Sequence, residues 1–210
     1  INVARVTVNA ATKTNWPKGP SIYGQTGVLI EASTGTVLYD KKCNKKMYPA
    51  SITKIMTALL TIENCKMDET VTFSDATIHS IQYGDANMGC SVGEKMTVKD
   101  CLYALMLQSA NEVATALGEH IAGSTEKFAE MMNKRAKEAG ALNTHFANAN
   151  GLHDPNHYVT AYDMAMITRA ASKYSVFNDI VNDIAPKFKE CDGIVIGSPV
   201  YFASANGTLV

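Results

Sequence analysis

Ser51 and Lys54 form the first pair in the chain whose residue types and spacing could do chemistry. They lie three positions apart where helical periodicity begins, so on a helix they share one face and the Lys54 amine can reach the Ser51 hydroxyl. The positive end of the helix dipole also favours the charge that develops on an attacking serine oxygen. The pair predicts a serine nucleophile and a lysine base, if burial or a neighbouring cation lowers the Lys54 pKa. The alternative is a capping serine followed by a solvated lysine.

A second polar group, Ser109-Ala110-Asn111, interrupts two apolar helical segments. Polar side chains in such surroundings need partners, because an unpaired buried group costs about 1–3 kcal/mol. A functional interpretation gives Ser109 a role in passing protons between Lys54 and a leaving group. Asn111 would then hold Lys54 and a substrate amide. The alternative is a helix–helix junction that pairs its own backbone.

The surrounding pattern predicts short strands followed by several helices, which is an α+β arrangement. Residues 27–40 read as two strands around a turn at Ser33-Thr34-Gly35. Apolar spacing and capping residues predict five helices. The first covers residues 51–64, the second begins at Thr97 and breaks near 108–111, and the third follows with Val113, Leu117 and Ile121 on its apolar face. The last two run from Ser124 to Gly140 and from Thr160 to about Ser172. Residues 144–159 have no periodicity and predict a loop.

Composition narrows the class of protein. The 210 residues carry 19 Lys and Arg against 20 Asp and Glu, so no basic field argues for a nucleic-acid partner. No apolar run reaches the roughly 18 residues that a membrane span needs. The chain opens with Ile1, from which we expect a processed or trimmed product. The five cysteines match no zinc or redox spacing and predict ordinary thiols, with at most one disulfide among the first four.

The two polar motifs together resemble those of the serine D-alanyl-D-alanine carboxypeptidases, which are low-molecular-mass penicillin-binding proteins of the serine β-lactamase fold. The resemblance covers about residues 21–182. It rests on Pro49-Ala50-Ser51-Ile52-Thr53-Lys54, Ser109-Ala110-Asn111, and the segments 32–35, 93–94, 150–154 and 158–163. It implies a β-lactamase/transpeptidase-like fold with a helical subdomain.

The resemblance also implies a mechanism. Ser51 would attack the bond between two terminal D-alanines of a peptidoglycan stem peptide, with Lys54 as general base, Ser109 as proton relay and Asn111 as a substrate-binding residue. An acyl-enzyme would form and water would hydrolyse it, without a metal or an organic cofactor. The implied partners are stem peptides ending in D-Ala-D-Ala and β-lactam antibiotics. The implied location is extracytoplasmic, either secreted or associated with the cell envelope.

The chain departs from the family in lacking a Lys-Thr-Gly motif. We therefore expect a carboxypeptidase domain over 1–182 that is truncated before the third-motif strand and has impaired activity. The alternative is a catalytically dead penicillin- or peptidoglycan-binding scaffold or a hybrid fragment. Residues 183–210 resemble a fragment of flavodoxin-like NAD(P)H-dependent FMN reductases, although no FMN binding is predicted. Residues 193–202 are expected to pair with an open sheet edge, in the same chain or in a strand-exchanged homodimer.

Two other interpretations are considered, a class A β-lactamase and a metal site. A class A β-lactamase needs a glutamate on a loop to activate water, and residues 143–160 contain none. His153 and His157 could be imagined as a metal pair, but Pro155 breaks the helix that would align them. We therefore predict no metal site.

Overall fold

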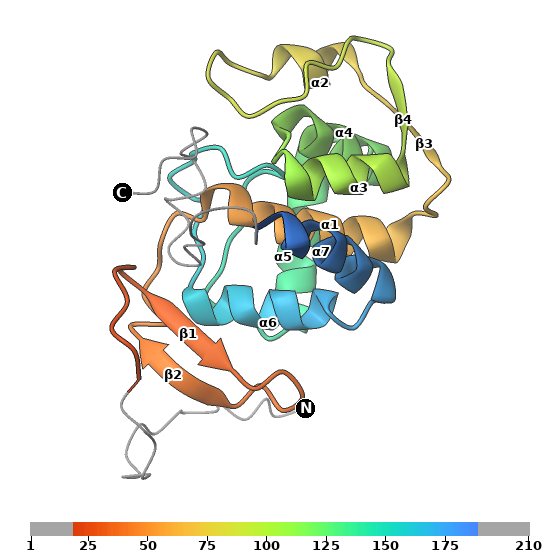
Figure 1. Cartoon of the computed structure of the whole chain (residues 1–210). Helices are drawn as coiled ribbons and strands as arrows, with labels where there is room; N and C mark the ends of the chain where they lie inside the picture. The colour runs from red at the N-terminus through yellow and green to blue at the C-terminus, as the bar shows by residue number, and fades with distance from the viewer. Residues whose placement is uncertain (1–18, 189–210) are drawn as a thin grey trace, which may run out of the picture.

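One central helix organises the protein. The computed structural model describes residues 19–188, to which the structural statements below refer. Helix α1 (Lys54–Asn64) contacts every longer helix around it (Figure 1): α3 (Val98–Leu107), α4 (Asn111–Ala122), α5 (Thr125–Glu138), α6 (Ala161–Ala171) and α7 (Ser175–Phe188). A β-hairpin packs beside α6, and a second antiparallel pair of strands lies on the far side of the bundle. The predicted α+β class is confirmed.

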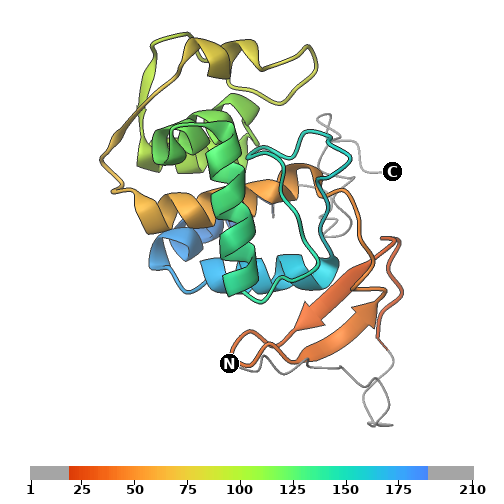
Figure 2. The ribbon, with the colours of Figure 1, turned by 180° about the vertical axis from the view of Figure 1, so that it is seen from behind.

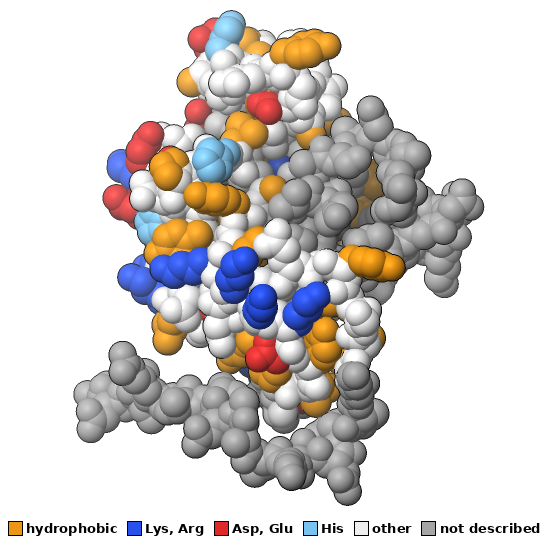
Figure 3. All heavy atoms as spheres, turned by 90° about the vertical axis from the view of Figure 1, so that its left-hand side faces the viewer, with side chains coloured by type: hydrophobic (Ala, Val, Ile, Leu, Met, Phe, Trp, Pro, Cys, Tyr) orange, Lys and Arg blue, Asp and Glu red, His pale blue; other side chains and the backbone are white. Residues whose placement is uncertain are grey.

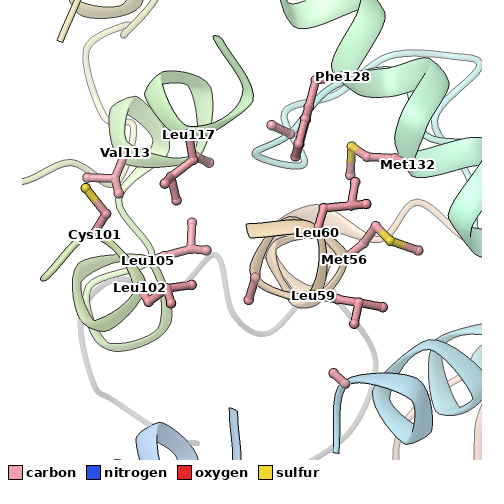
Figure 4. Packing of buried hydrophobic residues seen from close by; sticks show 14 of the residues in the cluster. Met56, Leu59, Leu60, Cys101, Leu102, Leu105, Val113, Leu117, Phe128 and Met132 are labelled. Carbon is pink, nitrogen blue, oxygen red and sulfur yellow. The ribbon is translucent and has the colours of Figure 1, made fainter. Parts of the chain in front are cut away.

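The core forms around the apolar face of α1. Met56, Leu59 and Leu60 are buried there and face side chains of three neighbouring helices (Figure 4): Leu102 and Leu105 of α3, Val113 and Leu117 of α4, Phe128 and Met132 of α5. Burying one such side chain contributes about 1.5–3 kcal/mol. The position of α1 is therefore set by contacts on several sides.

A polar contact also ties α1 to the helices around it. Glu63 near the end of α1 accepts two-pronged hydrogen bonds from Arg135 of α5, at 2.8–3.0 Å, and one from the Tyr174 hydroxyl at 2.8 Å. Burial alone would raise the Glu63 pKa, but the hydrogen bonds from Arg135 and Tyr174 outweigh it, and the pKa is lowered. This carboxylate links α1, α5 and the segment before α7.

The predicted N-terminal hairpin is present. Strands β1 (Gly27–Ile30) and β2 (Val37–Lys41) pair antiparallel with Gly27 opposite Lys41. Gly35 makes the turn with a φ of +78°, a conformation that favours glycine. Within residues 19–188 this sheet has two strands, so each strand has one edge without a strand partner. Helix α6 contacts β1.

The second pair of strands was not predicted from the sequence. It consists of β3 (Thr70–Thr72) and β4 (Lys95–Thr97), with the short helix α2 (Asp75–His79) in the connection between them. Strands of three residues are too short to leave a readable alternation. Together these elements form the cap at the top of Figure 1.

The predicted helix starts are confirmed by their caps. The side chains of Thr97, Ser124 and Thr160 each accept a hydrogen bond from the backbone N–H three residues later. The break between α3 and α4 lies at residues 108–110. The helix predicted from Ser51 differs in its first turn, which is a 3-10 turn, η1 (Ala50–Thr53), leading into α1.

The predicted loop before α6 is also present. It runs beside the N-terminal end of α1 in the view from behind (Figure 2). Isolated bridges pair Met47 with Val159 and His145 with Tyr158. The first bridge fixes the loop against the segment that leads into η1, and the second joins the two ends of the loop.

Helix α7 bears on the predicted domain boundary. It runs from Ser175 to Phe188 and so crosses position 182 without a break. The boundary stays a prediction. The predicted strand 193–202 lies outside the described residues, as does the flavodoxin-like tail from residue 189 onward.

Charges of both signs share the surface. On the face in Figure 3, Lys and Arg side chains form a row across the middle, and acidic side chains lie on both sides of it. One lysine, Lys46, lies with its Nζ 3.9 Å from the ring centre of Tyr158. Among the described residues no helix is long and apolar enough to cross a membrane.

Candidate active site

The Lys54 ammonium group lies at the centre of the predicted site. Its Nζ is 3.2 Å from Ser51 Oγ, 2.7 Å from Asn111 Oδ1 and 2.8 Å from the backbone oxygen of Asn150. The Lys54 side chain is 2% exposed. The structure thus brings together three of the four predicted residues, and their catalytic roles stay predictions.

The partners of Lys54 determine how a neutral amine would be oriented. An ammonium has three N–H donors, and here it has three acceptors. A neutral amine keeps two N–H groups and one lone pair. Since Asn111 Oδ1 and Asn150 O can only accept, they would take both N–H groups. The lone pair would then face Ser51 Oγ, which is the geometry of a base.

Burial also moves Lys54 toward the neutral form. Desolvation lowers the Lys54 pKa to about 8, against the opposing effect of the negative charges on Asp85 and Glu112. At pH 7 a pKa near 8 leaves about one tenth of the molecules with a neutral Lys54, where an exposed lysine would leave well under a thousandth. Burial therefore moves the Lys54 pKa in the direction that a lysine base requires.

A glycine lets the Asn150 loop reach the turn that carries Ser51. Gly151 has a φ of +89°, and a Cβ added there would lie 1.9 Å from the backbone oxygen of Ala50. Ala50 itself has a φ of +49°, unusual for a residue with a side chain. The loop is also fixed by its own bonds, because Asn148 Oδ1 accepts from the Gly151 N–H at 2.7 Å. Only glycine fits this close approach.

His157 contacts the same turn, η1, through Thr53. Its Nε2 is 2.9 Å from Thr53 Oγ1, and its Nδ1 accepts from the Ala147 N–H at 3.4 Å. This pairing places the ring proton on Nε2, which donates to Thr53. Burial lowers the His157 pKa to about 4, so the ring is neutral at pH 7. Both nitrogens are occupied within the protein, so His157 positions the turn that carries Ser51.

Ser109 lies just before α4 in a strained conformation, with a φ of +56°. Its Oγ is buried and has no hydrogen-bond partner among the described residues. No hydrogen bond joins Ser109 to Ser51 or Lys54. Its relay role therefore stays a prediction.

A cavity of about 380 Å³ opens at this cluster, within the size range of ligand pockets. Ser51, Asn111 and Asn150 line it, together with Asp85 and its neighbours in a segment that the sequence analysis did not single out.

That segment is attached to the start of α4. The Asn111 N–H donates to the backbone oxygen of Ala86 at 2.8 Å, and the Met88 N–H donates to Glu112 Oε1 at 2.5 Å. Glu112 is buried, and its other oxygen has no partner among the described residues. These are backbone-mediated contacts of a non-periodic loop, which leave no pattern in the sequence.

The comparisons with known proteins agree on one family. The family profile described as D-alanyl-D-alanine carboxypeptidase matches residues 11–192. The D-alanyl-D-alanine carboxypeptidase DacF of Bacillus subtilis is 43% identical over 155 residues, which is 71% of this chain and 39% of DacF. DacC of Escherichia coli is 33% identical over 161 residues, 73% of this chain and 40% of DacC.

Solved structures give the same result. A Streptomyces DD-transpeptidase superimposes with a TM-score of 0.73 at 32% identity, covering 78% of this chain and 66% of that one. Penicillin binding protein 6B of Escherichia coli superimposes with a TM-score of 0.73 at 28% identity, covering 79% of this chain and 55% of that one. The chain spans about two fifths of the length of the curated relatives just named.

Proposed function

Because the chain belongs to the D-alanyl-D-alanine carboxypeptidase family, we propose that it removes the terminal D-alanine from peptidoglycan stem peptides through an acyl-enzyme on Ser51. The observation that carries the proposal is the environment of the Lys54 amine. The amine is buried, its pKa is lowered, and two acceptors hold it so that the lone pair of its neutral form would face Ser51 Oγ. A capping serine with a solvated lysine, the alternative for this motif, would leave Lys54 exposed.

In the acylation step, Ser51 Oγ bonds to the carbonyl carbon of the D-Ala-D-Ala amide while its proton passes to Lys54 Nζ. The electron pair of the carbonyl moves onto its oxygen. Lys54 then carries a positive charge beside the newly negative centre. Asn111 Oδ1 and Asn150 O already accept from Lys54, so the ammonium forms without any rearrangement of its partners.

In the next step the tetrahedral centre collapses, the C–N bond breaks, and the leaving amine takes a proton. Ser109 is the proposed relay between Lys54 and this amine. The Ser109 Oγ has no hydrogen-bond partner among the described residues, which leaves its hydroxyl uncommitted. Water then hydrolyses the ester, with Lys54 again as the base.

Asn111 is the proposed substrate-binding residue. Its Oδ1 holds Lys54 at 2.7 Å, which turns its amide NH2 group to other acceptors. A peptide carbonyl of the stem peptide in the 380 Å³ cavity is such an acceptor. A β-lactam would enter as a mimic of the same dipeptide, and its leaving nitrogen would stay tethered to the acyl group.

Incubation with benzylpenicillin followed by intact mass measurement tests the nucleophile. We expect one adduct, mapped to the peptide that contains Ser51, in the wild type and in the exposed control Ser33→Ala. The variant Ser51→Ala should carry none. No adduct in a folded wild-type sample, or an adduct that persists in Ser51→Ala, would refute the assignment.

Release of D-alanine from a D-Ala-D-Ala peptide separates an enzyme from the alternative of a catalytically dead binding scaffold. We expect release that depends on Ser51. An adduct with benzylpenicillin and no D-alanine release would favour the scaffold.

We further propose an extracytoplasmic location, because peptidoglycan lies outside the cytoplasm. Within residues 19–188 one edge of β1 has no strand partner, and an apolar groove of about 560 Å³ lies between β1 and α6. Both features support a strand-exchanged homodimer through residues 193–202. Light scattering tests this, and a monodisperse monomer with a protease-sensitive tail would contradict it.

A further inference from the structure

A second cluster of reactive side chains lies at the opposite end of α1 from Lys54. Cys65, Glu69 and His120 each point one metal-binding atom into the same space, and these atoms lie within 4.8 Å of one another. The 11 residues of α1 separate this cluster from Lys54 by about 16 Å at 1.5 Å per residue. It is therefore a separate site from the one described above.

Three segments supply the three side chains. Cys65 is the C-cap of α1, where the backbone is extended and the Cys65 N–H donates to the Thr61 oxygen at 3.0 Å. Glu69 folds back over the next turn, because its Oε1 accepts from the Lys66 N–H at 2.9 Å. His120 lies in the last turn of α4. No sequence spacing could reveal the cluster, since His120 is more than fifty positions away.

The geometry already approaches that of a coordinated ion. His120 Nε2 and Glu69 Oε2 are hydrogen-bonded to each other at 3.2 Å. Tetrahedral coordination by zinc, with bonds of about 2.0–2.3 Å, places neighbouring donor atoms about 3.3–3.7 Å apart. The backbone bond to Oε1 orients the Glu69 carboxylate, as hydrogen bonds commonly do for metal-binding carboxylates. Cys65 Sγ lies within 4.8 Å of both atoms, so a shift of about 1 Å would bring all three donors to one ion.

We propose that Cys65, Glu69 and His120 bind one Zn²⁺ ion, with water as the fourth ligand. Thiolate, imidazole and carboxylate are the donors that zinc prefers in proteins. Mg²⁺ and Ca²⁺ are disfavoured because they require oxygen ligands, and two of the three donors here are sulfur and nitrogen. The His120 and Glu69 side chains are 28% and 38% exposed, which leaves an open side where water can complete the tetrahedron.

A bound ion would stabilise the fold. It would tie the C-terminal ends of α1 and α4 to the turn that leads into β3. A ligand that binds the folded state and not the unfolded chain raises the melting temperature, by an amount that grows with the logarithm of its concentration relative to its Kd. The site is remote from Ser51, so acylation should proceed at the same rate with and without zinc.

Calorimetric titration of the untagged, chelator-treated full chain with zinc chloride tests the proposal. We expect one Zn²⁺ per chain and a higher melting temperature with zinc than without. The variants Cys65→Ser and His120→Ala should each weaken binding by more than about tenfold. The matched controls Cys90→Ser and His79→Ala remove a thiol and an exposed imidazole elsewhere and should leave binding unchanged.

Co²⁺ in place of Zn²⁺ gives a second measurement, since a cobalt–thiolate bond produces a charge-transfer absorption band. The band should appear in the wild type and be absent in Cys65→Ser. Circular dichroism checks that each variant is folded, and Glu69→Gln, which keeps the side-chain shape, replaces any variant that is not. Binding that is absent in the wild type, or unchanged in Cys65→Ser and His120→Ala, would show an ordinary hydrogen-bonded cluster and overturn the proposal.

Discussion

Replacing Gly151 by alanine should disable the site while leaving the fold intact. The added Cβ would lie 1.9 Å from the Ala50 oxygen and 2.4 Å from the Ala50 carbon, both backbone atoms that cannot rotate away. Contacts below 3.0 Å are essentially never tolerated, so the loop and the turn that carries Ser51 must separate by about 1 Å. The same loop supplies the Asn150 oxygen that holds Lys54 at 2.8 Å.

The expected effect on catalysis follows from that displacement. A misplacement of about 1 Å in a reacting group can cost about a hundredfold in rate. We therefore expect the rate of acylation by benzylpenicillin to fall by about two orders of magnitude in Gly151→Ala, measured by stopping the reaction at intervals and taking intact masses. Circular dichroism should show unchanged helix content.

The control separates the clash from backbone strain. Gly123 has a φ of +78°, close to that of Gly151, but a Cβ there would meet nothing within 4 Å. Gly123→Ala should lower stability by about 1–2 kcal/mol, the cost of a left-handed residue with a side chain, and leave acylation unchanged. Wild-type acylation in Gly151→Ala, or an equal loss in Gly123→Ala, would refute the reasoning.

Three further predictions concern the charges of the fold. The acylation rate should rise with pH through about 8, as Lys54 loses its proton, and a profile that is flat between about pH 6 and 10 would contradict a lysine base. Asn111→Asp places a carboxylate 2.7 Å from Lys54 and should raise the Lys54 pKa. Acylation at pH 7 should then fall about tenfold or more, and the pH profile of the rate should move to higher pH. The control Asn111→Ala should slow acylation without shifting the pH profile. The Glu63 pKa is lowered in the folded state, so its contribution to stability is present above the pKa of the unfolded chain and is lost as the pH falls through the folded value. Glu63→Gln should lower the free energy of unfolding by about 1–2 kcal/mol in urea titrations at pH 7 and flatten its decline in acid; an unchanged midpoint would show that Arg135 and Tyr174 add nothing.

Local signals were sufficient for part of the site. Ser51 and Lys54 lie within one turn, so their spacing alone places them together. Asn111 could be placed because its polar triplet interrupts two apolar helices. Asn150 could not be placed from the residues, since it holds Lys54 through a backbone oxygen that every residue type possesses. The same holds for the Gly151 contact, because a close backbone approach depends on tertiary packing.

In the fold, too, the elements set by local sequence were predicted and those set by long-range contacts were not. Helices with a cap and a long apolar face were predicted near their observed positions. The strands of three residues at Thr70–Thr72 and Lys95–Thr97 were not, because they are held by pairing with each other across more than twenty residues. His157 was considered only as a metal ligand, whereas its position is explained by the buried hydroxyl of Thr53, more than a hundred residues earlier.

The lowered pKa of Lys54 depends on burial, so the reactivity of Ser51 should depend on how far the chain has folded. Desolvation lowers the Lys54 pKa, and that desolvation requires segments as far apart as Asn111 and Asn150 to have closed around the amine. A chain in which α1 has formed but the loop is still open would carry an ordinary, fully charged lysine beside Ser51. During refolding, reactivity toward benzylpenicillin should therefore appear after helix formation. The fraction of reactive molecules should equal the fraction in which Asn111 and Asn150 already contact Lys54.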